Sequence, residues 1–305
     1  MTAFRSGFAC FVGRPNAGKS TLTNALVGDK IAITSSKPQT TRHAIRGLVH
    51  TEDAQLILVD TPGLHRPRTV LGERLNDLVR STWADVDTVA MCLPADQRVG
   101  PGDKFLVKEL AQLRRKPILA VATKTDLVSP TRLARHLMDV QKAGDEAGVR
   151  WAEIVPVSAT AGDQVELLRD LLIQTLPEGQ PLYPDGQLTD EPAETLIAEV
   201  VREAALEGVR DELPHSLAVV VEEVVPREDR PANKPLTDVR VNVYVERDSQ
   251  KGIVIGHRGT RLREIGAASR RQIEKILGTP VYLDLHVKVA KDWQRDPKQL
   301  RKLGF

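Results

Sequence analysis

A glycine-rich stretch near the amino terminus, "FVGRPNAGKST", has the residue types and spacing of a phosphate-binding loop. It fits the pattern GxxxxGK[ST] and stands between an apolar, strand-like run and a helical pattern. In that context, backbone N–H groups of the loop and of the helix amino terminus converge on phosphate oxygens, and the lysine adds positive charge. The hydroxyl of Ser20 is then a candidate ligand of Mg²⁺. The predicted phosphate-binding residues are Gly13, Asn16, Ala17, Gly18, Lys19, Ser20 and Thr21.

A second group of candidate ligands follows the next strand-like run, "LILVDTPG". Asp60 at the strand end is predicted to hold Mg²⁺ through a water, and the backbone N–H of Gly63 to sense a γ-phosphate. The polar segment "KPQTTRHAIRG" precedes this strand, and either Thr40 or Thr41 could reach Mg²⁺ and the γ-phosphate. The alternative for each threonine is a solvated loop. The predicted switch residues are Gln39, Thr40, Thr41, Asp60, Thr61, Pro62 and Gly63. Two of them, Thr41 and Asp60, form the predicted magnesium set together with Ser20 of the phosphate loop.

Two later strand ends carry residues suited to reading a guanine base, "VATKTDLV" and "VPVSATAG". The carboxylate of Asp126 can accept from both N1–H and the exocyclic amine of guanine, a match that adenine cannot make. Lys124 is predicted to lie along the base, and Ser158 and Ala159 to close the pocket with a backbone N–H. The predicted guanine-binding residues are Thr123, Lys124, Asp126, Ser158 and Ala159.

The stretch "GIVIGHRGTRLREIG" forms a second glycine loop after apolar, strand-like residues. It lacks the GK[ST] ending, so it offers no Mg²⁺ ligand. It fits the GxxG of a KH domain, in which glycines let an RNA backbone approach and a helix amino terminus attracts phosphate. The alternative is a plain turn, but the basic helix behind the loop favours RNA. The predicted RNA-binding residues are Gly256, His257, Arg258, Gly259, Arg261 and Arg263, with the apolar residues Leu262, Ile265, Ile273 and Ile276 assigned to the core.

Alternation of apolar runs with amphipathic helical patterns predicts an α/β fold in the first part of the chain. Short, continuous apolar strands between helices are typical of a mostly parallel sheet covered by helices on both faces. This pattern stops near residue 176, and residues 177–192 are rich in Pro, Gly and acidic residues, which predicts a linker. Residues 193–305 read as helix, two strands, glycine loop, helix and strand, with room for one extra helical turn. We expect an α+β type II KH domain there.

Composition and charge limit the classes of protein. With 41% hydrophobic and 28% charged residues over 305 positions, the chain can form two cores. Residues 178–250 hold 7 Lys and Arg against 17 Asp and Glu, whereas residues 251–305 hold 13 against 5, so the basic face is expected to contact polyanions. Two cysteines form no disulfide framework, the histidines lack zinc-ligand spacing, and no apolar run is long enough to span a bilayer. A cytoplasmic location is expected.

Taken together, "GRPNAGKS", "QTTRH", "DTPG", "TKTD" and "SA" resemble the five nucleotide motifs of the Era family of bacterial Ras-like GTPases, and the likeness continues to the closing "KVAKDWQRDPKQLRKLGF". The resemblance implies GTP and GDP as nucleotides, Mg²⁺ as cofactor, and a monomer. It also implies binding to 16S rRNA near its 3′ end, a role in assembly of the small (30S) ribosomal subunit, and peripheral contact with the inner face of the cell membrane. One departure is Thr123, where the family has asparagine; GTPases of the Rho type also carry threonine there and bind guanine.

The residue after the DTPG glycine bears on how the attacking water is oriented. Ras-like enzymes that orient the water with a side chain have glutamine there, whereas this chain has Leu64. Resemblance to GTPases that share "GRPNAGKS" suggests K⁺ near Asn16, supplying the positive charge that an arginine finger would supply, and the alternative is that Asn16 only caps the loop. Two other classes of protein are alternatives: a P-loop phosphotransferase, and an RNA-binding module with nucleotide as a structural ligand. The guanine motifs favour the GTPase over both.

Overall fold

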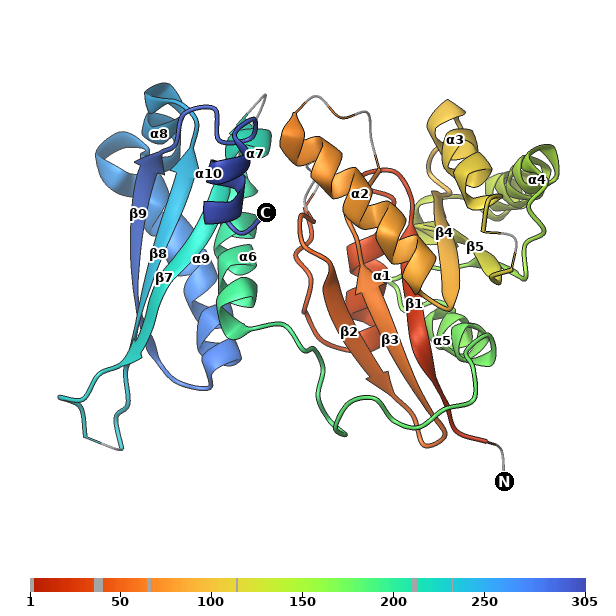
Figure 1. Ribbon diagram of the computed structural model, residues 1–305, viewed down its shortest axis with the longest axis horizontal. Coiled ribbons are helices and arrows are strands. Elements are labelled where there is room, and N and C mark those ends of the chain that lie inside the picture. The colour runs from red at the N-terminus through yellow and green to blue at the C-terminus, as the bar shows by residue number, and fades with distance from the viewer. Residues whose placement is uncertain are drawn as a thin grey trace. The chain divides into compact units, whose positions relative to one another are not determined.

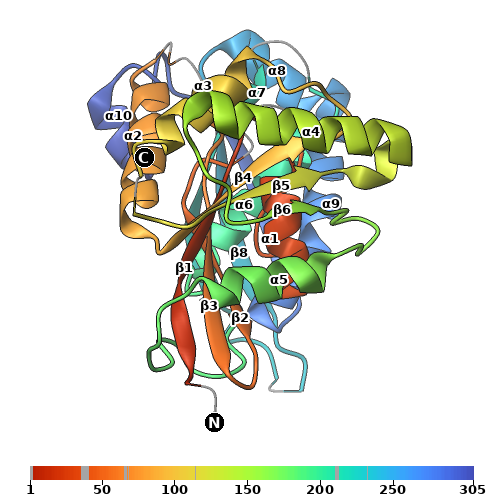
Figure 2. The same cartoon turned by 90° about the vertical axis from the view of Figure 1, so that its right-hand side faces the viewer.

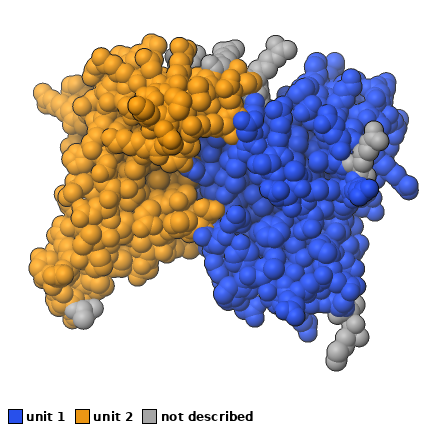
Figure 3. Space-filling view, in the orientation of Figure 1, with its two compact units in different colours: residues 1–34, 41–66, 75–190 blue, residues 35–40, 67–74, 191–305 orange. Residues whose placement is uncertain are grey.

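The computed structural model describes residues 3–305 except 36–40, 65, 66, 68, 114, 210–212 and 232. It divides into two compact units (Figure 3). The first comprises residues 1–34, 41–66 and 75–190, and residues 191–305 form the body of the second. The domain boundaries predicted at residues 176 and 192 stay predictions. In the structure, residues 177–190 belong to the first unit.

The first unit contains a six-stranded sheet that is parallel except at one edge (Figure 1). The strand order is β2-β3-β1-β4-β5-β6, and only β2 runs antiparallel to its neighbour. The fold class predicted from the sequence is confirmed. The strands are β1 Arg5–Val12, β2 Ile45–His50, β3 Ala54–Asp60, β4 Thr88–Pro94, β5 Ile118–Thr123 and β6 Ile154–Pro156.

Strand β2 was not among the predicted strands, because its short sequence "IRGLVH" begins within the polar segment assigned to the switch. As an edge strand it needs apolar residues only where it faces the helices. Ile45 and Leu48 are buried, whereas Arg46 is exposed.

Helices cover both faces of this sheet, as Figure 2 shows. One core packs Leu22 and Leu168 against the strands, and the other packs Trp83, Leu106 and Val140. Helices α1 and α5 therefore cover one face, and α2, α3 and α4 the other. The bounds are α1 Lys19–Val27, α2 Val70–Asp85, α3 Pro101–Leu110, α4 Pro130–Ala147, α5 Val165–Gln174 and the short η1 Thr125–Leu127.

Both cysteines lie in the strands of this core. Cys10 and Cys92 are free and buried. Burial raises the pKa of the Cys92 thiol to about 12 and raises that of Cys10 as well. Because the thiolate is the reactive form, both cysteines are inert core residues in the folded protein.

The predicted linker is bound along the edge of the sheet. The side-chain oxygen of Gln55 accepts from the backbone N–H groups of Leu182 (2.6 Å) and Tyr183 (2.9 Å), and its amide donates to the Tyr183 carbonyl (2.8 Å). Arg46 and the Tyr183 hydroxyl both donate to Asp190, at 2.7 and 2.8 Å. Residues 182–190 thus lack regular structure but have fixed positions on β2 and β3.

The second unit is a three-stranded sheet with helices packed on one face (Figure 1). Strand β8 lies in the middle, antiparallel to β7 and parallel to β9. The element order α-β-β-α-α-β of α6, β7, β8, α8, α9 and β9 is that of a type II KH domain. The bounds are α6 Ala193–Leu206, α7 Leu213–Ser216, β7 Ala218–Pro226, β8 Thr237–Val245, α8 Asp248–Ile255, η2 His257–Gly259, α9 Thr260–Leu277, β9 Val281–Val289 and α10 Pro297–Lys302.

The apolar residues before the second glycine loop form a helix and not a strand, which corrects the sequence interpretation. Helix α8 begins where the side chain of Gln250 accepts from the backbone N–H groups of Glu246 and Arg247, at 2.9 and 3.1 Å. Its apolar run is three residues long, and only Val254 is buried. Such short runs fit a strand or a buried helix turn equally well. Helix α8 is also the extra helical element for which the sequence left room.

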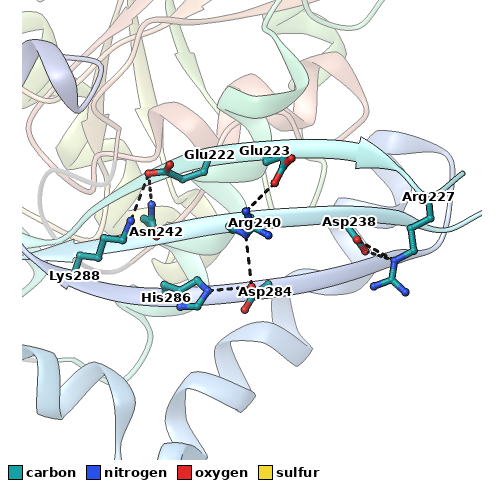
Figure 4. Close-up of polar contacts among 9 residues, drawn as sticks. All are labelled: Glu222, Glu223, Arg227, Asp238, Arg240, Asn242, Asp284, His286 and Lys288. Carbon is teal, nitrogen blue, oxygen red and sulfur yellow. Dashed lines mark hydrogen bonds and ion pairs between the residues drawn. The ribbon is translucent and has the colours of Figure 1, made fainter.

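The exposed face of this sheet carries paired charges (Figure 4). Arg240 lies 2.9 Å from Glu223 on β7 and 3.8 Å from Asp284 on β9.

Trp293, which follows β9 in the chain, is fully buried. Its ring N–H donates to the Ser216 carbonyl (3.0 Å), and the ring stacks on Phe305 with 5.5 Å between the ring centres. Trp293 is therefore a packing residue.

Candidate functional site

The loop between β1 and α1 has the geometry that its glycines predict. A side chain at Gly13 would place Cβ 2.9 Å from the Cys92 carbonyl oxygen, so no other residue fits without movement of the backbone. Gly18 at the helix start has a φ of 90°, in the left-handed region that favours glycine. Asn16 also has a positive φ, 62°, a conformation that asparagine tolerates better than most residues. The loop is therefore held open for an anion at the amino terminus of α1.

Lys19 supplies the charge of this loop. Its side chain is 6% exposed, and the ammonium donates to the carbonyl oxygens of Gly13 and Arg14 at 3.3 and 3.2 Å. Burial lowers the pKa of Lys19, and the nearby Asp60 carboxylate opposes that shift. A phosphate in the loop would favour the charged form further, so binding of nucleotide and protonation of Lys19 support each other.

Three oxygen-bearing side chains meet beside the loop, as predicted for a magnesium site. The hydroxyl of Ser20 donates to Oδ2 of Asp60 at 2.7 Å, and that of Thr41 donates to the same oxygen at 3.2 Å. The two hydroxyls are 3.0 Å apart. Hydroxyl and carboxylate oxygens are the hard donors that Mg²⁺ prefers, so this donor set fits the ion. Of the two threonines left open by the sequence, Thr41 reaches the site; Thr40 and Gln39 lie outside the described residues.

The residues after Asp60 run close to the phosphate loop. The Thr61 hydroxyl donates to the Phe11 carbonyl at 3.4 Å, and a side chain at Gly63 would place Cβ 2.8 Å from the backbone nitrogen of Pro15. Gly63 therefore brings its backbone against the loop, next to Pro62. Leu64 is 8% exposed and packs in the core of the first unit, so it offers no group to an attacking water.

The guanine motifs meet at the carboxyl ends of β5 and β6. The Ser158 hydroxyl donates to Oδ1 of Asp126 at 2.6 Å and accepts from the backbone N–H of Ala161 at 3.1 Å, which fixes the carboxylate. Lys124 has a left-handed φ of 58° and lies 3.9 Å from Asp96. Asp126 is exposed and Ala159 half-buried beside it. The described residues thus bring Lys124, Asp126, Ser158 and Ala159 together at one site.

The side chain of Thr123 joins the guanine loop to the phosphate loop. Its hydroxyl donates to the carbonyl of Ala17 in the phosphate loop at 2.7 Å, and both residues are buried. Threonine in place of asparagine therefore still provides a hydrogen-bond donor at position 123. That donor links the guanine loop to the phosphate loop.

A clamp on the phosphate loop was missed by the sequence analysis. The Arg14 guanidinium donates to Oδ1 of Asp103 at 2.7 Å, and Oδ2 of Asp103 accepts from the backbone N–H of Gly100 at 2.9 Å. Asp103, at the start of α3, is 1% exposed. The spacing Gly100-x-x-Asp103 before an apolar run is a helix-start signal that could have placed Asp103, although not its contact with Arg14.

In the second unit, the GxxG loop forms one end of a groove of about 600 Å³. Gly256 has a φ of 71°, and a Cβ there would lie 2.7 Å from Cβ of Arg261, so glycine is required by both conformation and space. The groove is cationic along its rim and small or apolar on its floor. Its lining residues are Arg258, Gly259, Leu262, Arg263, Gly266, Ala267, Arg270, Tyr282, Leu283 and Leu285. Leu262, which the sequence assigned to the core alone, is only partly buried against that core and also lines the groove.

The structure places one predicted RNA contact elsewhere. The guanidinium of Arg261 donates to the carbonyls of Ala205 (3.2 Å) and Glu207, at the end of α6, and does not line the groove. Because Arg261 follows the loop by two residues, the sequence suggested that its charge was available to RNA. In the structure its side chain points toward α6 and joins α9 to α6. Gly259, Arg258 and Arg263 lie at the groove, and His257 sits in the loop itself.

Other kinds of site find no support among the described residues. Outside the gaps given above, the structure contains no group of three or more His, Cys, Asp or Glu side chains arranged to hold a metal. In the same described part of the chain, no helix has both the length and the apolar character needed to cross a membrane.

The fold and the two sites define a P-loop GTPase joined to a KH domain. The profile of the family described as "50S ribosome-binding GTPase" matches residues 8–124, and that of the KH domain matches residues 212–294. GTPase Era of Streptomyces coelicolor is 69% identical over 100% of this chain and 96% of its own length, and GTPase Era of Nocardioides sp. is 71% identical over 99% and 97%. The chain belongs to the GTPase Era family, and its enzymatic activity is the hydrolysis of GTP to GDP and phosphate.

Solved structures of relatives agree over the whole length. A variant of Era from Aquifex aeolicus bound to GDP·AlF4⁻ superposes with a TM-score of 0.92 at 35% identity, covering 99% of both chains. A second solved Era, in complex with MgGDPNP and nucleotides 1506–1542 of 16S ribosomal RNA, also has a TM-score of 0.92, at 36% identity and 99% of both chains.

Proposed function

We propose that this GTPase is a Mg²⁺-dependent switch that binds the single-stranded 3′ end of 16S rRNA in its KH groove and acts in assembly of the small ribosomal subunit. The observation that carries the proposal is the solved relative that holds MgGDPNP together with nucleotides 1506–1542 of 16S rRNA and matches this chain over 99% of its length. The meeting of Ser20, Thr41 and Asp60 supports the choice of Mg²⁺. The groove beside the GxxG loop supports RNA.

Binding of RNA and nucleotide by the same molecule tests this proposal. We expect an RNA spanning nucleotides 1506–1542 to bind more tightly to the protein loaded with a non-hydrolysable GTP analogue than to the GDP form, and GTP turnover to change when that RNA is added. Affinity is measured by fluorescence anisotropy, and turnover by release of radiolabelled phosphate. RNA affinity that is equal in the two nucleotide states, with turnover unaffected by RNA, would leave nucleotide as a structural ligand of an RNA-binding module.

We further propose that K⁺ near Asn16 supplies the positive charge that an arginine finger supplies in other GTPases. Leu64 is buried in the core, so the gap left by the absent glutamine must be filled from outside that side chain. The backbone of Asn16, within the phosphate loop, is in the left-handed region, with a φ of 62°.

The K⁺ proposal predicts that GTP hydrolysis rises when Na⁺ is replaced by K⁺ at constant ionic strength, and that Asn16→Ala removes the difference. Asn16→Gly is the matched variant, because glycine accepts the positive φ that alanine resists. Both variants should lose the K⁺ effect, while the glycine variant keeps GTP affinity near that of the wild type. Equal rates of the wild-type protein in the two salts would contradict this role and leave RNA or ribosome contacts as the activator.

Three features stay predictions: a cytoplasmic location, peripheral contact with the inner face of the membrane, and a monomeric state. Fractionation of cells and light scattering of the purified protein test them directly.

A further inference from the structure

The groove of the second unit extends along α9 beyond its GxxG loop, and Tyr282 of β9 is among its lining residues. From Gly259 to Arg270 the groove follows eleven residues of α9, which is about 16 Å at the rise of an α-helix. Tyr282 lies near the Arg270 end of this stretch, because its neighbour Val281 donates its backbone N–H to Glu274 (3.2 Å), one helical turn beyond Arg270.

The ring of Tyr282 is both exposed and fixed. Tyr282 is 55% exposed although it lines the groove. The guanidinium of Arg227 lies over one face of the ring, with its central carbon 5.2 Å from the ring centre. Arg227 is itself held by Asp238, whose carboxylate oxygens lie 2.7 and 2.9 Å from Nε (Figure 4). If Tyr282 served only to favour the strand conformation, it would need neither the Arg227 contact nor the Asp238 carboxylate that holds Arg227.

A fixed aromatic ring near one end of a cationic groove is suited to one kind of ligand. Bases of single-stranded nucleic acid stack on such rings without regard to sequence, because every base has a π-face. Hydrogen-bond readout would instead need polar groups directed at base edges, and the ring face offers none. The rim residues Arg258, Arg263 and Arg270 lie along the path by which an RNA backbone would reach the ring.

We propose that Tyr282 is a stacking platform for an RNA base that lies just outside the groove, positioned by Arg227 and Asp238. The inference rests on the proposed function, since it assumes that single-stranded RNA occupies the groove. A KH groove holds about four nucleotides, so Tyr282 would contact the next nucleotide along the strand. It would thereby lengthen the bound segment and add affinity that depends little on which base is present.

The test compares short RNAs that differ by one nucleotide. Tetranucleotides are tiled across the ribosomal fragment used to test the proposed function, and the tightest binder is extended by one nucleotide at either end, with a base or with an abasic sugar. For the wild-type protein, one of the two extensions should improve affinity about tenfold, in line with the stacking of one base. The abasic extension should give no gain, because it retains the phosphate but lacks the π-face.

Variants then assign the gain to the ring. Tyr282→Ala should abolish the gain from the added nucleotide, whereas Tyr282→Phe, which keeps the ring, should preserve it. His286→Ala serves as the matched control, because His286 is an exposed residue of the same strand outside the groove lining. Retained GTP binding and an unchanged circular dichroism spectrum show that each variant is folded.

The outcomes separate this inference from the one on which it rests. A gain that survives in Tyr282→Ala, or that the abasic extension also produces, overturns the stacking role while the groove remains an RNA site. If no tetranucleotide binds the wild-type protein, the proposed function fails, and the stacking role fails with it.

Discussion

Asp126→Asn should weaken GTP binding by about 2 to 4 kcal/mol and shift the preference toward xanthosine triphosphate. The carboxylate at position 126 can accept from two donors on guanine, and an asparagine amide would direct an N–H group at one of them. Xanthine carries a carbonyl at the corresponding position and so accepts from the new amide. The measurement is a pair of affinities, for GTP and for xanthosine triphosphate, on the wild type and the variant.

The structure makes this substitution a clean test. Ser158 donates to Oδ1 of Asp126, and the amide oxygen of asparagine can accept the same hydrogen bond, so the side chain should keep its place. Asp126 is exposed, which limits any cost to folding. Asp139→Asn, at an exposed position of α4, makes the same chemical change away from the site and should leave both affinities unaltered. GTP affinity that is unchanged in Asp126→Asn would refute the guanine assignment.

Sequence reasoning predicted well where a motif fixes backbone and side chain together. The phosphate loop was found because Gly13 and Gly18 serve conformations and spaces that no other residue fits, and because Lys19 and Ser20 must follow at fixed positions on α1. Asp60 was found for a similar reason, since it ends a buried strand and points out of the sheet. Such patterns carry their geometry within a few residues, so the sequence alone defines them.

Contacts between distant segments could not be predicted in this way. The Arg14 to Asp103 ion pair joins residues 89 positions apart, and the hydrogen bond from Thr123 to Ala17 spans 106. Neither has a local signal that names its partner. Arg261 shows the converse error, because a basic residue beside a glycine loop looks available for RNA until the direction of its side chain toward α6 is known. The aromatic platform at Tyr282 was missed because an isolated tyrosine in a strand is ordinary in sequence.

A related limit applies to the segment between the two units. Its Pro, Gly and acidic residues correctly predicted the absence of helix and strand over residues 177–190, apart from the bridge of Glu178 to Arg5. Composition does not reveal that Gln55 and Arg46 bind this segment to the sheet edge. Lack of regular structure and lack of fixed position are separate properties, and only the first can be predicted from composition.

Replacing His257 and Arg258 together by Asp should reduce RNA affinity on the order of a hundredfold, because like charges brought together cost several kcal/mol. The two carboxylates would stand in the GxxG loop, where RNA phosphates must approach. The dependence of affinity on salt should also become shallower, by about 0.7 in the log–log slope for each cationic contact with a single strand that is lost. Filter binding or anisotropy over a series of salt concentrations measures both effects.

The loop should tolerate these changes. Arg258 has a left-handed backbone, with φ 50°, and aspartate is among the residues that adopt this conformation most readily. His257 and Arg258 are both at the surface, and neither belongs to the core of the second unit. Arg135→Glu with Gln112→Glu changes the net charge by the same amount at exposed positions of the first unit, and it serves as the control for nonspecific repulsion. GTP binding should be intact in both double variants, because the phosphate loop lies in the first unit.

Two results would contradict this assignment of the second glycine loop. If the His257 and Arg258 double variant binds ribosomal RNA as tightly as the charge-matched control, RNA does not pass over the loop, and the cationic rim formed by Arg263 and Arg270 must hold it without the glycines. If the double variant instead loses GTP while the control keeps it, the loop contributes to the nucleotide site. Gly256→Ala distinguishes these cases more finely, because any side chain at position 256 collides with Arg261. This variant should impair RNA binding through the shape of the loop alone. Since its charge is unchanged, no cationic contact is lost, and the slope of affinity against salt concentration should stay that of the wild type.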